Sequence, residues 1–111
     1  MKKYDFVPEG LELETEDGWM LLLEDLLDKI QELVDKNPKK YEKLQLKSIE
    51  KIFGMLFVTF EPYFSDVEVI CGHYSSKSIF VCEKCGGKAT LKLVGGEIVP
   101  LCKKHYKSKG E

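Results

Sequence analysis

Two short segments near the end of the chain decide its fold: Cys82-Glu83-Lys84-Cys85-Gly86-Gly87 and Leu101-Cys102-Lys103-Lys104-His105. They contain two Cys-x2-Cys/His pairs, with sixteen residues between the pairs. Zinc prefers four sulfur or nitrogen ligands in a tetrahedron, and a two-residue spacer lets one chain turn supply two of them. We therefore predict a single Zn²⁺ ion bound by Cys82, Cys85, Cys102 and His105.

The residues between the two pairs fit a hairpin that returns the second pair to the first. Residues 89–94 and 97–101 are typical of strands, and Gly95-Gly96 is a two-residue hairpin signal. Cys102 and His105 are spaced i and i+3, which predicts the first turn of a short C-terminal helix. This order of elements is that of a treble-clef zinc finger. A closed set of three cysteines and one histidine leaves no open coordination position, so the predicted site is structural and not catalytic.

Other uses of these cysteines are less favoured. A disulfide between Cys82 and Cys85 needs an oxidising compartment, whereas the N-terminus does not resemble a signal peptide. A redox Cys-x-x-Cys motif is expected within a βαβ pattern, which is absent from the sequence. The longest apolar run near the start, residues 19–23, is too short to span a bilayer. We expect a cytoplasmic protein without a membrane segment.

The N-terminal part predicts a long amphipathic helix over about residues 18–36. Asp17 is the expected N-cap, and Asn37-Pro38 ends the helix. Its apolar residues recur at steps of three and four, and this stripe consists of Trp19, Leu22, Leu23, Leu26, Leu27, Ile30, Leu33 and Val34. Carboxylates occupy the opposite face, which we expect to be solvated.

Two strands are expected after this helix. Residues 46–51 and 55–60 flank Phe53-Gly54, where a hairpin or a bulge is predicted. Residues 1–16 fit either a short edge strand or an extended lead-in, and the sequence leaves that choice open.

A second helix is predicted over about residues 66–76, with Ser65 and Glu68 forming a capping box. Cys71 falls on its apolar stripe and is expected to be buried as a small hydrophobic residue, with His73 exposed. A less favoured alternative makes Cys71 or His73 the fourth metal ligand in place of His105, or makes Cys71-Gly72-His73 part of a second site.

Together these elements predict an α+β fold: an N-terminal amphipathic helix on a small antiparallel sheet, a second helix, and a treble-clef-like zinc finger. At 111 residues, one domain is expected over 1–111, with a helix and sheet core in 1–80 and a zinc-binding subdomain in 81–111.

Charge is distributed unevenly along the chain. Residues 1–37 carry four lysines and eleven acidic residues, a net charge of −7, and residues 38–111 carry thirteen lysines and eight acidic residues, a net charge of +5. An acidic surface can steer the chain to a basic groove on a partner. The chain has no arginine, which disfavours sequence-specific reading of DNA.

The sequence resembles a group of small bacterial and phage proteins. The resemblance covers about residues 18–106 and rests on Gly18-Trp19, on Lys51-Ile52-Phe53-Gly54-Met55-Leu56-Phe57, and on the two zinc-ligand segments. This sequence lacks a basic residue after the leucine of the Phe-Gly segment and a tryptophan in the second hairpin strand, both common in the group. The group is frequent on mobile genetic elements, where some small metal-binding phage proteins are anti-CRISPR inhibitors. The resemblance implies a host protein as partner, such as a CRISPR effector nuclease.

Three functions fit these features to different degrees. The favoured one is a non-enzymatic, zinc-stabilised protein-interaction module that binds an RNA-guided nuclease through an acidic surface. The alternative is a lysine-rich zinc finger that binds DNA or RNA, since residues 81–111 hold seven lysines, Lys107 and Lys109 among them, and three glutamates. A metal-dependent hydrolase is disfavoured because it needs an open metal position with carboxylates nearby.

Overall fold

In the computed structural model, which describes residues 4–106, the predicted apolar stripe forms the buried face of helix α1 (Met20–Lys36). The helix ends at Lys36, directly before Asn37-Pro38 as predicted, and the N–H of the C-cap residue Asn37 donates to the Val34 carbonyl. Its start differs from the prediction. A single 3-10 turn, η1 (Asp17–Trp19), precedes the helix, and Trp19 is the N-cap residue without a side-chain cap. Asp17 is therefore not the cap, because the chain reaches the helix through this extra turn.

The hairpin of β1 (Gln45–Ile52) and β2 (Met55–Glu61) turns at Phe53-Gly54, as predicted. Both turn residues have positive φ, 51° and 76°, which is the backbone of a two-residue turn whose twist matches the strands. A register shift lies at the other end of the hairpin, between Leu46 and Ser48. The alternate side chains of β2 are buried, so this sheet has one face on the core.

Helix α2 (Ser65–Ser78) packs against both α1 and β2. The predicted capping box is wrong: Phe64 is the N-cap residue, and its carbonyl accepts the N–H of Glu68 at 3.0 Å. The Asp66 carboxylate accepts a hydrogen bond from the free backbone N–H of Val67 at 3.0 Å. The Ser65 hydroxyl therefore does not cap the helix. Near the other end of the helix, the buried Ser78 hydroxyl accepts the Leu56 N–H of β2 at 2.8 Å and fixes the helix on the sheet.

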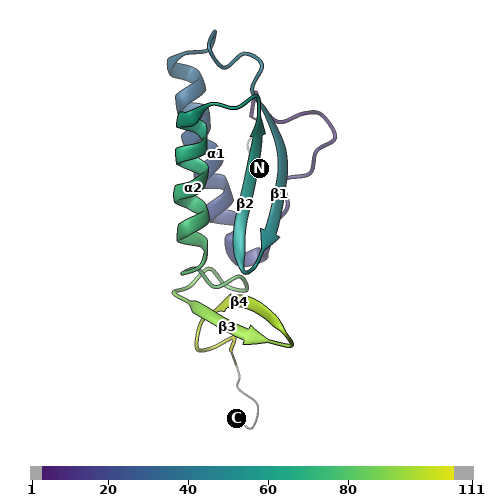
Figure 1. Ribbon diagram of the computed structural model, residues 1–111, viewed down its shortest axis with the longest axis vertical. Helices are drawn as coiled ribbons and strands as arrows, with labels where there is room; N and C mark the ends of the chain where they lie inside the picture. Colours follow the sequence, from purple (N-terminus) through teal and green to yellow (C-terminus); the bar gives the residue numbers. More distant parts are fainter. Residues whose placement is uncertain (1–3, 107–111) are drawn as a thin grey trace.

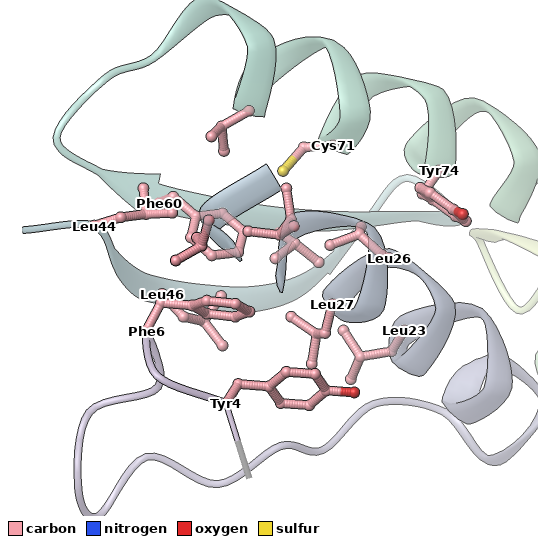
Figure 2. Packing of buried hydrophobic residues seen from close by; sticks show 14 of the residues in the cluster. Tyr4, Phe6, Leu23, Leu26, Leu27, Leu44, Leu46, Phe60, Cys71 and Tyr74 are labelled. Atoms are coloured by element: carbon pink, nitrogen blue, oxygen red, sulfur yellow. The ribbon is translucent and has the colours of Figure 1, made fainter. Parts of the chain in front are cut away.

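The two helices and the first hairpin enclose the main core (Figure 1). Figure 2 shows apolar side chains of α1, α2 and β2 meeting between these elements, with Tyr4 and Phe6 beside them. The chain from residue 4 to residue 16 contains no strand, and it is joined to β1 by the Leu46 N–H donating to the Phe6 carbonyl at 2.8 Å. The early segment is therefore neither the predicted edge strand nor fully extended: it contains turns at residues 5–6 and 9–10, and the side chains of Tyr4 and Phe6 complete the core.

The C-terminal part lies at one end of the elongated molecule (Figure 1). Strands β3 (Thr90–Val94) and β4 (Glu97–Leu101) pair antiparallel around the predicted two-residue turn at Gly95-Gly96, whose φ angles are 57° and 84°. After β4, residues 103–105 form a turn, and no C-terminal helix is present within the described residues. Residues 107–111, where that helix would continue, lie outside them. The predicted α+β class is confirmed, since residues 4–106 contain two α-helices and two small antiparallel sheets.

Neither helix in the described part of the chain is both long and apolar enough to cross a bilayer.

Candidate metal centre

The structure brings the four predicted ligand side chains together at the C-terminal end. Their ligand atoms all lie within 4.8 Å of one another, a group that could hold a metal ion. Cys82 is fully buried beneath the centre, whereas Cys85 and His105 are exposed at its outer side. The metal centre thus has one ligand in the protein interior and two ligands exposed to solvent.

The spacing of these atoms fits a tetrahedral zinc site. With bonds of about 2.3 Å to sulfur and about 2.1 Å to nitrogen, a tetrahedron has edges of about 3.8 Å between sulfurs and about 3.6 Å between sulfur and nitrogen. The Sγ atoms of Cys85 and Cys102 are 3.7 Å apart, and the Cys82 Sγ is 3.7 Å from the His105 Nδ1. The Cys102 Sγ lies somewhat closer to that Nδ1, at 3.2 Å. These three distances therefore lie within about 0.4 Å of the edges of a tetrahedral zinc site.

A tight turn of the backbone builds the first ligand pair. The Cys82 N–H donates to the Gly87 carbonyl at 2.7 Å, and the Gly86 N–H donates to the Cys82 carbonyl at 2.8 Å. The Gly87 N–H points at the Cys85 sulfur, 3.4 Å away, where it can stabilise a thiolate. We call residues 82–87 the knuckle.

The second ligand pair follows directly from β4. The Cys102 carbonyl accepts the backbone N–H groups of His105 and Tyr106, at 3.1 and 2.9 Å, which makes one helical turn between the two ligands. Hence the two side chains project toward the same point, as the i, i+3 spacing predicts.

Electrostatics favour a thiolate at the buried ligand. Burial alone raises the pKa of Cys82, but hydrogen bonds from the backbone N–H groups of Cys102, Cys85 and Lys84 outweigh it and lower the pKa to about 6. The lowered pKa increases the fraction of Cys82 present as thiolate, which is the form that binds metal.

Cys71 and His73 lie outside the metal-ligand group, and within residues 4–106 that group is the one set of three or more potential ligands close enough to hold an ion. Cys71 is buried in the main core among α1, α2 and β2 (Figure 2), and burial raises its pKa to about 12, with a smaller contribution from the Glu68 charge. It is the small buried hydrophobic residue that the sequence predicts. His73 is exposed, with its ring edge-on to Tyr74.

Gly18 and Trp19 hold the knuckle against the start of α1. The Gly18 N–H donates to the Glu83 carbonyl at 2.8 Å, and the indole N–H of Trp19 donates to the Val81 carbonyl at 3.0 Å. A Cβ atom on Gly18 would lie 2.0 Å from the Cys82 carbonyl oxygen, so only glycine allows this approach.

An ion-pair cluster joins the same two parts of the molecule. The Lys51 ammonium at the end of β1 lies 3.3 Å from carboxylate oxygens of both Glu16 and Glu83. The Glu83 side chain is only 6% exposed, so the lysine neutralises a buried carboxylate within the knuckle. No local pattern in the sequence marks this contact, because Lys51 and Glu83 are 32 residues apart.

A groove of about 570 Å³ lies beside this junction, between α1, the end of α2 and the knuckle. We call it the acidic groove, because four carboxylates line it: those of Asp17, Glu24, Asp25 and Asp28. Leu21 also lines the groove and is 81% exposed. The acidic helix face is visible in the sequence but the groove is not, since the knuckle that forms its other wall comes from a distant part of the chain.

Hydroxyl groups from neighbouring segments fix two of these carboxylates. Tyr74 of α2 donates to Asp25 at 2.7 Å, and Tyr4 donates to Asp28 at 2.8 Å. Two of the four carboxylates of the acidic groove are therefore held in place by side chains of packed elements.

Comparison of the chain with protein-family models, with curated proteins and with solved structures finds no match in any of the three.

Proposed function

We propose that the metal centre binds Zn²⁺ and that the ion has a structural role. Three thiolates and one imidazole are a donor set that suits zinc, and four protein ligands fill its tetrahedron. No position is then left for water or substrate. Binding of the ion would fix the knuckle and the second ligand pair to each other, and so create the wall of the acidic groove.

We propose further that the protein is a non-enzymatic interaction module that binds a basic protein surface through the acidic groove. The observation that carries this proposal is the exposed Leu21 in a groove lined by four carboxylates and one lysine, Lys77, with two of the carboxylates held by tyrosine hydroxyls. An apolar side chain at the centre of an interface supplies binding energy once it is desolvated, while charges around it steer the encounter and select the partner.

The partner that fits this chemistry is a host protein with a basic groove and an apolar contact within it. RNA-guided nucleases belong to this class, because they hold nucleic acid in positively charged channels. We propose a CRISPR effector nuclease as the partner, with the acidic groove occupying part of its nucleic-acid surface and blocking it.

The test is quantitative capture from a lysate of the host, followed by measurement of the affinity of each captured protein for purified variants. Leu21→Ser and Glu24→Lys change the acidic groove. We expect each to weaken binding of a basic partner about tenfold or more, as is typical of central interface residues. Added salt is expected to slow association of the wild type.

Matched controls make the same chemical changes elsewhere. Val69→Ser removes a side chain that is 72% exposed on α2, and Glu42→Lys reverses a charge in the exposed turn before β1. Zinc content confirms that every variant is folded. A partner that binds the groove variants and the control variants equally well would refute the proposal, as would a partner with an acidic binding surface.

A further inference from the structure

A second pocket, of about 530 Å³, lies on the metal-binding part of the chain, at the side where the second ligand pair begins. Buried Ala89 and Leu101 close its base. We call it the lysine pocket, because its rim carries Lys88, Lys92, Lys103 and Lys104.

None of these four lysines forms a salt bridge with a carboxylate that the structure describes. By contrast, Lys29, Lys40, Lys47 and Lys51 each have such a partner. No acidic residue lines the lysine pocket. A bound Zn²⁺ with three thiolates would carry one net negative charge, which offsets only one of the four ammonium groups. The pocket therefore keeps an excess of positive charge.

One of these cations has a fixed position. The Lys92 ammonium lies 4.8 Å from the centroid of the Tyr106 ring, a cation–π contact. Lys92 is also half-buried, so its ammonium is held at the rim of the pocket. Binding of a ligand to Lys92 therefore costs less side-chain entropy than binding to a lysine that must first be ordered.

We propose that the lysine pocket binds a single-stranded nucleic acid, with backbone phosphates on the lysines and a base in the apolar pocket. The ligand must combine several negative charges with a flat, largely apolar body, and a nucleotide strand has both. A duplex does not expose its bases in this way, and an acidic peptide lacks the flat apolar group.

The cations of the pocket are lysines and not arginines, and this determines the expected selectivity for nucleotide sequence. Lysine contacts a phosphate as a point charge and does not form the bidentate fork by which arginine reads guanine. Hence we expect binding that tolerates any sequence and depends strongly on salt. This inference does not rest on the proposed protein partner, because the lysine pocket and the acidic groove share no lining residue.

The test is fluorescence anisotropy of a labelled oligothymidylate of about 12 nucleotides, a typical site size, titrated with the zinc-loaded protein. If all four lysines contact phosphates, log K falls with log salt with a slope of about −2.8, or about −0.7 for each contact. The double variant Lys88→Gln/Lys104→Gln is expected to have a slope smaller in magnitude by about 1.4 and to bind about 60-fold more weakly at ~50 mM salt.

The control variant Lys29→Gln/Lys47→Gln makes the same change in net charge at exposed lysines of α1 and β1. It is expected to bind like the wild type. Equal loss of affinity in both double variants would overturn the proposal, because net charge alone would then explain binding. No binding at ~50 mM salt would also overturn it.

Two further measurements complete the test. The first distinguishes a site for nucleic acid from a site for an acidic peptide, and the second distinguishes the loss of phosphate contacts from the loss of bound metal. Unlabelled polyglutamate should displace the oligonucleotide far less well than unlabelled oligothymidylate, and equal displacement would show an anionic-peptide site instead. If Lys104→Gln lowers the zinc content, Lys88→Gln/Lys92→Gln replaces the first variant, with the same expected loss of affinity and the same contradicting result.

Discussion

Replacing Gly18 with alanine is expected to separate the knuckle from the start of α1. The added Cβ atom would lie 2.0 Å from the Cys82 carbonyl oxygen, 2.6 Å from the Gly86 nitrogen and 2.7 Å from the Glu83 carbonyl carbon. All three are backbone atoms of the knuckle, so no side-chain rotation relieves the contact. The knuckle must move by more than about 1 Å to restore ordinary van der Waals distances, which are near 3.5 Å.

The cost follows from the hydrogen bonds that this movement breaks. The Gly18 N–H to Glu83 and the Trp19 indole N–H to Val81 are both lost, at about 1 kcal/mol each, and more where the groups stay buried without a partner. The gain from replacing glycine in the chain is at most about 1 kcal/mol. We expect a net loss of about 1–3 kcal/mol in the free energy of unfolding of the zinc-loaded protein.

Urea unfolding followed by circular dichroism and by tryptophan fluorescence measures this loss. Trp19 is the single tryptophan of the chain and is fully buried at the junction, so its emission reports the separation directly. Since docking and metal binding are linked, a loss of about 2 kcal/mol corresponds to zinc affinity weaker by up to about 30-fold in competition with a chelator.

The matched control is Gly72→Ala. Gly72 lies within α2, and a Cβ atom there would meet nothing within 4 Å. This variant should therefore raise the free energy of unfolding by about 0.5–1 kcal/mol and leave zinc affinity unchanged. If Gly18→Ala unfolded at the same urea concentration as the wild type, with unchanged Trp19 emission, the docking of the knuckle as described would be wrong.

Further measurements test the metal centre and the groove. Cys85→Ser and Cys102→Ser are each expected to lower bound zinc and stability together, and full zinc stoichiometry in both variants by elemental analysis would contradict the ligand set. Chelation of the metal should shift the emission of Trp19 to longer wavelength while most helical circular dichroism remains; an unchanged emission would show that the junction does not depend on the ion. Burial and the hydrogen bond to Asp25 raise the pKa of Tyr74 to about 12, so its contribution is complete below about pH 10, the usual tyrosine value, and is lost as the pH rises through about 12. Tyr74→Phe should make the alkaline loss of stability shallower, and an identical pH profile would contradict the buried contact.

Local patterns in the sequence predicted most of the secondary structure. The apolar stripe of α1, the turn at Phe53-Gly54 and the Gly95-Gly96 hairpin each depend on residues within a few positions of one another. The two Cys-x2-Cys/His pairs are equally local, and the hairpin between them explains why they meet. Such features can be predicted from the sequence because the residues whose interactions determine them are close together in the chain.

The errors lie where a distant segment decides the local structure. Asp17 matches the pattern of an N-cap, but the knuckle docks on Gly18 and the chain enters α1 through an additional 3-10 turn. Ser65 matches a capping box, but the Asp66 carboxylate takes the amide of Val67 and also accepts the hydroxyl of Tyr41, which is 25 residues away. Competition between partners of this kind has no signature in a short window of sequence.

The junction also bears on where specific recognition takes place. Gly18-Trp19, Lys51 to Gly54 and the knuckle are far apart in the sequence, and in the structure they lie at one junction. Trp19 donates to Val81, Lys51 pairs with Glu83, and a Cβ atom on Gly54 would lie 2.7 Å from the Ile98 carbonyl oxygen of β4. These residues hold the metal-binding part against the core.

The proposed recognition of a partner would then use side chains outside this junction. Leu21 and Glu24 of the acidic groove and the four lysines of the lysine pocket lie outside the junction. Both sites depend on the same metal-binding part, since residues 85–86 line the first and residues 101–104 line the second. Removal of the ion is therefore expected to abolish both binding activities, whereas substitutions within either site should abolish only one. That contrast separates the structural role of the metal from a direct role in binding.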